Sequence, residues 1–355
     1  VGKTAAVPIQ KITGPEGSGM TGFVIVDLDG ATAADGVVRC AKKILMDGAR
    51  TMARSRSYSW ALLGEQRSGA SAAINVAPPD RDAGIAAFVD AVAPRVAAGE
   101  LSIDAGKGVG QSELAALQEV DGRSKLRVQA RTGGTLADEL TATSAVTAAA
   151  VALGGLEGRT VAIEGAGALG PALLEVLAAA GARVIAIGTS AGTLVDQAGL
   201  DPVTTTSSWA EHGESLPAAN GSELGADEVL RTPADLVLCG SKLGLVDHAV
   251  AAGLRTQVLA PIGIAPITAK GLAVAARAGV IVLADFLTLS GGLHTFVADP
   301  TTTPDALVES VTARTTEVTR AALDHDDGAY LGACALAEQF LSTWNDELPF
   351  GRPLA

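Results

Sequence analysis

A glycine-rich segment near the middle of the chain has the spacing of a phosphate-binding turn. Its members are Gly165, Ala166, Gly167, Ala168, Leu169 and Gly170. The pattern G-x-G-x-x-G follows an apolar, β-branched stretch at 160–163 and precedes a helical pattern at 169–180. We expect Gly165 to permit the tight turn, Gly167 to let the backbone approach a pyrophosphate, and Gly170 to let the helix pack closely on the strand. In this setting the pattern predicts dinucleotide binding, and the alternative is a turn made only for packing.

The residue that reads the adenosine ribose is expected at the end of the next strand, about 20 residues further on. Thr189 lies 19 residues after Gly170 and is followed by Ser190, without a carboxylate at 188–190. Hydroxyl side chains tolerate a 2′-phosphate, which favours NADP. No arginine follows to neutralise that phosphate, so NAD stays open, as does a purely turn-capping role for both side chains.

The elements around this loop predict an α/β fold. Apolar strands alternate with helices from 160 to 283, which is typical of a parallel sheet buried on both faces. In the N-terminal third, 23–28 is a predicted strand, and 36–54 and 82–98 are predicted helices. We expect an N-terminal mixed α/β domain at 1–135 for substrate binding and oligomerisation, a Rossmann-like domain at 136–300, and C-terminal helices at 301–355 that return toward the N-terminal domain.

Composition narrows the possible partners. The 355 residues carry 26 Lys and Arg against 39 Asp and Glu, a net charge of −13, which disfavours binding to nucleic acids and to anionic membranes. No run reaches the ~18 apolar residues needed to span a bilayer; the nearest, 143–155, fits a buried helix better. The 3 cysteines are far apart, no His pattern predicts a metal site, and the first residues lack a signal-peptide core. We therefore expect a cytoplasmic protein without a metal.

Several stretches resemble the glutamate/leucine/phenylalanine/valine dehydrogenase family, nearest its leucine and phenylalanine branch. Residues 57–74 are similar to the family's substrate segment, and 103–109 to the segment around its catalytic aspartate. Residues 154–165 resemble the entry to its nucleotide domain, and 284–292 its "P-D-x-x-x-N-A-G-G" motif. The resemblance implies a two-domain oligomer, with the active site in the cleft between the domains. It implies interconversion of 2-amino and 2-oxo acids with NAD or NADP, with Asp104 transferring the proton.

The departures from the family are as informative as the matches. The family lysine that grips the substrate carboxylate falls at Ser59, and the lysine that polarises the carbonyl falls at Ser71, with the 12-residue spacing kept. A serine brings no positive charge and cannot replace a lysine as an acid/base. The family asparagine before the closing glycines falls at Leu289.

Other cations could compensate. Lys107 lies three residues after Asp104, Arg67 four residues before Ser71, and Arg39 resembles the arginine of the family's "G-G-T-R" segment. Lys242 follows Cys239, Gly240 and Ser241, a strand end and loop that we expect to face the cofactor.

Three functions remain open. The preferred one is an NAD(P)-dependent oxidoreductase of the amino-acid dehydrogenase type, a homo-oligomer with altered specificity, acting on a C–N or C–O centre of a small substrate. The second is a catalytically inactive dinucleotide-binding or regulatory homologue. The third is a cofactor-dependent enzyme without redox chemistry.

Overall fold

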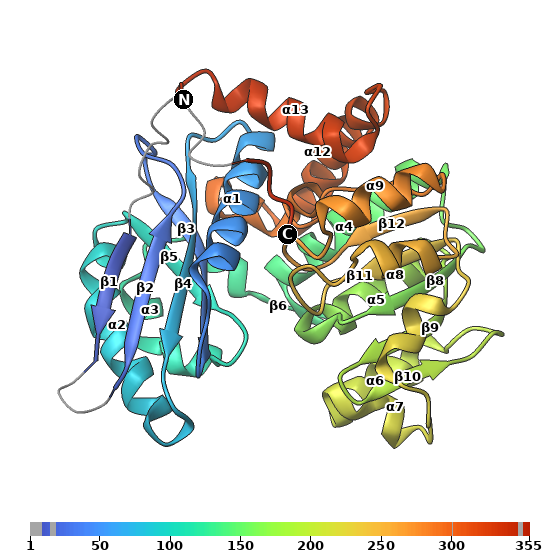
Figure 1. The fold of residues 1–355 in the computed structure, drawn as a ribbon, viewed down its shortest axis with the longest axis horizontal. Coiled ribbons are helices and arrows are strands. Elements are labelled where there is room, and N and C mark those ends of the chain that lie inside the picture. The colour runs from blue at the N-terminus through green and yellow to red at the C-terminus, as the bar shows by residue number, and fades with distance from the viewer. Residues whose placement is uncertain (1–8, 15–18, 300, 347–350) are drawn as a thin grey trace. The chain divides into compact units, whose positions relative to one another are not determined.

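The computed structural model describes residues 9–14, 19–299, 301–346 and 351–355. Contacts divide the fold into two compact units. Unit 1 is Val1–Arg123 with Ala337–Pro353, and unit 2 is Ser124–Leu336 with Leu354–Ala355. The predicted class is confirmed: a mixed α/β unit, a Rossmann-like unit and C-terminal helices (Figure 1). These units are defined by contacts and not by function. The functions predicted for 1–135, 136–300 and 301–355 therefore stay predictions.

Unit 1 is built on a five-stranded sheet in the order β1-β2-β4-β3-β5. The strands are β1 (Ile9–Thr13), β2 (Thr21–Val26), β3 (Ala34–Ala41), β4 (Ser68–Asn75) and β5 (Leu101–Ala105). β1, β2 and β4 pair antiparallel, whereas β3 pairs parallel with both β4 and β5. Side chains in one row of this sheet therefore point to the same face.

Helices cover both faces of that sheet. They are α1 (Met46–Leu62), α2 (Arg81–Ala97) and α3 (Ala115–Val120). On one face, α1 packs Ala49 and Ala53 against Phe23 and Ala73. On the other, α2 packs Phe88 among alternate strand residues such as Val24, Val38 and Ile103. A methyl group on Gly69 would lie 1.9 Å from the Ala53 carbonyl oxygen, so glycine is needed there for α1 to approach β4.

The predicted helix at 36–54 is wrong in its first half. Residues 34–41 form β3, the strand between β4 and β5, and α1 begins only at Met46. Val37 and Val38 already have β-branched side chains, and pairing on both sides outweighs the weak helical spacing. Elsewhere, α2 lies within one residue of the predicted 82–98 helix.

Unit 2 is built on a six-stranded sheet in the order β10-β9-β8-β11-β12-β13. Its strands are β8 (Thr160–Glu164), β9 (Arg183–Thr189), β10 (Gly192–Val195), β11 (Leu236–Cys239), β12 (Val258–Pro261) and β13 (Ile281–Val282). A short ribbon joins β6 (Ala130–Arg131) to β7 (Gly134–Thr135). The sheet is parallel except at one edge, where β10 folds back antiparallel on β9. The prediction of a parallel sheet missed this hairpin because its strand has only four residues.

The helices of unit 2 are α4 (Leu136–Leu153), α5 (Gly170–Ala179), α6 (Pro202–His212), α7 (Leu216–Ala219), α8 (His248–Gly253), α9 (Ala269–Arg277), α10 (Asp285–Thr288), α11 (His294–Val297) and α12 (Pro304–Leu323). α4 and α5 pack on the apolar face formed by Val161, Ile163 and Leu238. Within the described residues, α4 alone is long and apolar enough to cross a membrane, but half of its apolar stretch is buried in unit 2. The last helix, α13 (Ala329–Leu341), carries the chain from unit 2 into unit 1.

Candidate active site

The glycine-rich loop joins β8 to α5 through a single 3₁₀ turn at Gly167–Leu169. Gly165 and Gly167 have positive φ angles, +66° and +52°, in the left-handed region that favours glycine. A methyl group on Gly165 would lie 2.4 Å from Ser241 Cβ, whereas one on Gly167 would meet nothing within 4 Å. Gly165 is therefore required by packing, and Gly167 leaves open space over the loop. No side chain caps the start of α5, although Gly170 N already donates to the Gly167 carbonyl oxygen and Pro171 has no N–H group.

Gly170 is required for a reason other than the predicted one. A methyl group there would lie 2.6 Å from the ring of Trp209, on α6. The glycine thus makes room for an indole ring and not for the strand. The predicted role assumed a partner close in sequence, whereas α6 arrives from 39 residues downstream.

Glu164 ties the glycine loop to the loop after β11. Its Oε2 accepts hydrogen bonds from Gly240 N at 3.0 Å and Ser241 N at 3.1 Å. Two amides expected to serve a cofactor are therefore already engaged by a buried carboxylate. Cys239 is fully buried, and burial, followed by the charges of Glu164 and Asp285, raises the pKa of its thiol well above the usual range. This favours the small buried hydrophobe over a reactive thiol.

The end of β9 carries a carboxylate that the local sequence lacks. Glu214, after α6, accepts hydrogen bonds at Oε2 from Ser190 N at 3.1 Å and Ser190 Oγ at 3.2 Å. Thr189 Oγ1 donates to the Glu214 carbonyl oxygen at 2.6 Å. Residues 188–190 contain no acid, which favoured NADP, but in the folded chain a carboxylate from a distant segment lies at this strand end. The hydroxyls do hold the turn, as their alternative role predicted.

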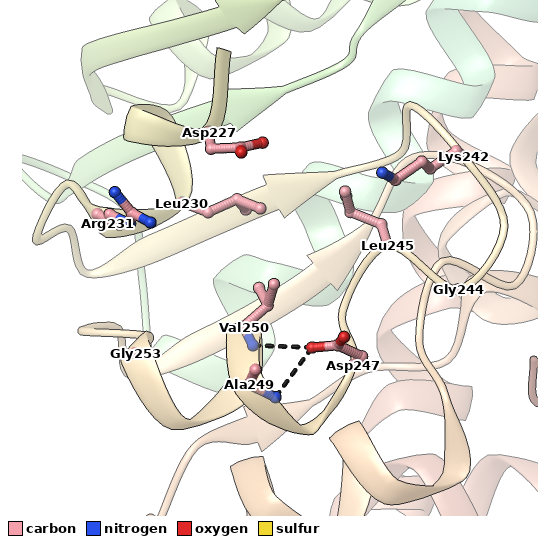
Figure 2. Close-up of a pocket in the computed structure, with 10 residues that line it drawn as sticks. All are labelled: Asp227, Leu230, Arg231, Lys242, Gly244, Leu245, Asp247, Ala249, Val250 and Gly253. Carbon is pink, nitrogen blue, oxygen red and sulfur yellow. Dashed lines mark hydrogen bonds between the residues drawn. The ribbon is translucent and has the colours of Figure 1, made fainter. Parts of the chain in front are cut away.

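A cavity of about 370 Å³ lies between the loop after β11, α8 and the 3₁₀ helix η6 (Ala226–Arg231). The apolar side chains of Leu230, Leu245 and Val250 line it together with those of Asp227 and Lys242 (Figure 2). Asp247 instead caps α8, accepting from Ala249 N and Val250 N at 2.9 Å each. The structure therefore places Lys242 at this cavity.

In unit 1, the predicted substrate residues share one face of the sheet. Ser71 on β4 and Asp104 on β5 both pair with Val37 of the strand between them, so their side chains point to the same side. With strands about 4.8 Å apart, their Cα atoms are on the order of 10 Å apart. Arg39 points to the same face, two residues further along β3.

Arg39 and Ser71 carry buried polar atoms without partners. Nε and Nη2 of Arg39 and Oγ of Ser71 make no hydrogen bond within the described residues. Burial lowers the pKa of Arg39. Buried donors without acceptors are rare in folded proteins, so these atoms mark a place where an anionic or polar ligand would be stabilised.

Asp104 is held by an arginine that sequence reasoning missed. Arg123 donates to Oδ2 and Oδ1 of Asp104 at 2.8 Å each and to Asp121 Oδ2 at 2.7 Å through Nε. Burial alone would lower the pKa of Arg123, but hydrogen bonds and charges from the two carboxylates raise it above its usual value. Asp35, fully buried and bonded to Trp60 Nε1, lies close enough to interact with both Asp104 and Arg123.

The remaining predicted residues make other contacts. Ser59 Oγ donates to the Ser55 carbonyl oxygen at 3.3 Å, inside α1. Arg67 stacks over the Trp60 ring, 5.0 Å from its centroid. Arg67 precedes β4, about 20 Å along the strand from the position that pairs with Arg39. The Lys107 side chain is exposed, while its carbonyl oxygen accepts from Cys40 N. Within the described residues, no group of three His, Cys, Asp or Glu could hold a metal ion.

Comparison with known proteins finds a family match over part of the chain. Residues 133–298 match the model described as glutamate/leucine/phenylalanine/valine dehydrogenase. This match covers just under half of the chain and supports the predicted resemblance to the family. Glutamate dehydrogenase from Aeropyrum pernix is 30% identical over 141 residues, which are 40% of this chain and 34% of that protein. The match thus spans about a third of the length of that relative.

Solved structures extend the likeness of the fold to nearly the whole chain. The hetero-hexameric glutamate dehydrogenase from Thermus thermophilus has a TM-score of 0.81 at 19% identity, over 97% of this chain and 89% of that one. L-tryptophan dehydrogenase from Nostoc punctiforme has a TM-score of 0.60 at 14% identity, over 95% of both chains. The dehydrogenase fold therefore extends beyond the nucleotide-binding part that the family model matches.

The sequence gives only weak signals for the three residues that the sequence analysis missed, Arg123, Glu164 and Glu214. Arg123 lies in a polar stretch, 121–134, interpreted as a domain boundary. Glu214 lies 24 residues after Ser190 in a short 3₁₀ helix, Gly213–Ser215, that carries no motif. Glu164 directly precedes the glycine loop. An acid at the end of an otherwise apolar strand was a signal in the sequence that could have identified it as a residue of the site.

Proposed function

We propose that the chain is an NAD(P)-dependent oxidoreductase of the amino-acid dehydrogenase type, transferring hydride at a C–N or C–O centre of a small substrate. The observation that carries the proposal is the open left-handed backbone at Gly167, next to the uncapped start of α5. Amide groups and bare backbone at a helix start are suited to a diphosphate. The cavity lined by Leu230, Leu245 and Val250 would receive the adenine.

The substrate class follows from Arg39. A half-buried guanidinium with unpartnered donors is suited to a carboxylate, which arginine binds through two parallel hydrogen bonds. Ser71 Oγ would donate to an oxygen of the same substrate. We therefore propose a small organic acid, gripped by a guanidinium where the family resemblance implies lysines at positions 59 and 71. This is the basis of altered specificity.

Asp104 is proposed to move the proton. A bound nicotinamide ring would give or take the hydride. Asp104 keeps about a quarter of its side-chain surface exposed, so a substrate atom can reach it, while Arg123 fixes its orientation. Arg39 and Arg123 orient and stabilise charge only, since an arginine does not give up its proton in proteins.

Binding and turnover are tested separately. The purified chain is titrated with NADH and NADPH by fluorescence, then amino acids, 2-oxo acids with ammonia, and hydroxy acids are screened at 340 nm. Binding followed by turnover of an acid substrate supports the proposal. Turnover only of substrates that lack an acidic group would contradict the role of Arg39, and no dinucleotide binding would remove the whole proposal.

A second function is an inactive dinucleotide-binding homologue. It is favoured by one observation: both oxygens of Asp104 are already bonded to Arg123. If that ion pair persists when ligands bind, no free base remains. Dinucleotide binding without turnover across the whole screen would favour this function over the first.

The assembly is also part of the proposal. The Thermus thermophilus structure is described as hetero-hexameric, which supports an oligomer here. We propose a homo-oligomer, and light scattering after size exclusion would measure its mass against the 35.4 kDa chain.

A further inference from the structure

We infer that Glu214 supplies the carboxylate that reads the adenosine ribose and makes the site select NAD(H) over NADP(H). This rests on the proposed function, since it concerns one end of the same dinucleotide. Cofactor choice would then depend on a residue outside the strand–turn segment that normally carries this acid.

The geometry begins with the hairpin at the end of β9. Thr189 pairs with Gly192, so Ser190 lies at the tip, 19 residues after the last loop glycine. This is the position from which a Rossmann fold contacts the ribose hydroxyls. Neither hydroxyl side chain at the tip carries charge.

Glu214 brings the missing charge to that tip. Its Oε2 is fixed by Ser190 N and Oγ, and its backbone carbonyl by Thr189 Oγ1. These three bonds hold one segment against the other from both its backbone and its side chain. Within the described residues Oε1 makes no hydrogen bond, which leaves an acceptor for ribose hydroxyls.

No cation offsets this charge. Within the described residues, Glu214 forms no ion pair with Lys, Arg or His. A 2′-phosphate placed here would meet an uncompensated carboxylate, whereas a 2′-hydroxyl would donate a hydrogen bond to it. Repulsion between like charges a few ångströms apart near a protein surface corresponds to NADH binding on the order of 100-fold more tightly than NADPH.

The test measures dissociation constants of NADH and NADPH by fluorescence for the full chain and three variants. Wild type is expected to bind NADH about 100-fold more tightly. Glu214→Gln keeps an acceptor but removes the charge, so this ratio should fall at least 10-fold. Glu214→Arg should favour NADPH. The control is Glu211→Gln, an exposed carboxylate three residues before Glu214 near the end of α6, which should leave the ratio unchanged.

Each other outcome is decisive. Tighter binding of NADPH by wild type, or a ratio unchanged within 2-fold in both Glu214 variants, would overturn the inference while leaving the proposed function intact. Binding of neither dinucleotide by correctly folded wild type would overturn the proposed function and this inference with it. Circular dichroism and thermal unfolding establish that each variant is folded before its ratio is compared.

Discussion

Arg123 donates one hydrogen bond to each carboxylate oxygen of Asp104, both at 2.8 Å. The same guanidinium contacts Asp121, whose side chain is 5% exposed, while that of Arg123 is 6% exposed. One buried cation therefore pairs with two carboxylates and joins the end of β5 to the segment at 121–123. This relationship sets both the position of Asp104 and a part of the stability of the unit.

The first prediction concerns that stability. Arg123→Met should lower the free energy of unfolding by about 3 kcal/mol, because it removes the cation that pairs with the buried Asp121 and with Asp104. The measurement is urea denaturation followed by circular dichroism. Arg50→Met is the matched control: Arg50 pairs with the exposed Asp47 on α1, and its loss should cost under about 1 kcal/mol. Equal losses in both variants would contradict a buried Arg123 pair.

The second prediction concerns proton transfer. Asp104→Asn keeps the shape and one acceptor oxygen for Arg123, but it cannot accept a proton from the substrate. Turnover should fall about 10²- to 10⁴-fold, while the dissociation constant of the dinucleotide, which we propose binds in unit 2, stays the same. Steady-state kinetics and fluorescence titration give the two values. Full turnover in this variant would remove Asp104 from the mechanism.

The third prediction concerns Glu164. Glu164→Gln keeps an oxygen acceptor for Gly240 N and Ser241 N and removes a negative charge next to the glycine loop. We expect several-fold tighter binding of NADH because a diphosphate is repelled less. Glu164→Ala, which removes the side-chain acceptor, should instead destabilise the chain by about 1 to 3 kcal/mol. Weaker NADH binding in the glutamine variant would show that the charge assists the loop.

Local patterns predicted the parts of the site that are local in the chain. The glycine loop was predictable because its strand, turn and helix follow one another within about 20 residues, and the glycines needed for positive φ are visible in the sequence. α12 (Pro304–Leu323) lies within the range predicted for the C-terminal helices, 301–355, since Thr303 caps it and Pro304 opens it.

Long-range contacts decided what the sequence did not reveal. Glu214 reaches Ser190 only because α6 folds back on α5, where Trp209 packs on Gly170. Arg123 reaches Asp104 across 19 residues of loop and short helix. No periodicity encodes either pairing. The strand at 34–41 was missed for the same reason, since its two neighbours in the sheet come from distant segments.

The fourth prediction concerns the acid dependence of stability. Burial first, and then the charge of Arg314, lowers the pKa of His294 from 6.5 to about 4. The unfolded chain therefore takes up a proton near pH 6.5 that the folded chain takes up only near pH 4, so stability falls as pH falls through this window. Between pH 7 and pH 5, His294→Gln should lose about 1 to 2 kcal/mol less than wild type. His248→Gln, at an exposed position on α8, should behave as wild type.

The last prediction separates binding from backbone strain at the glycine loop. Gly167→Ala introduces a methyl group into open space at φ +52°, so the chain should fold with a cost of about 1 kcal/mol, but the methyl group would occupy the path of the diphosphate. NADH affinity should fall at least 10-fold. Gly158→Ala is the matched control, because Gly158 also has a positive φ, +69°, and open surroundings, but lies before β8. It should show the same loss of stability with unchanged affinity. Equal affinity in the two variants would mean that the diphosphate does not approach the backbone at Gly167.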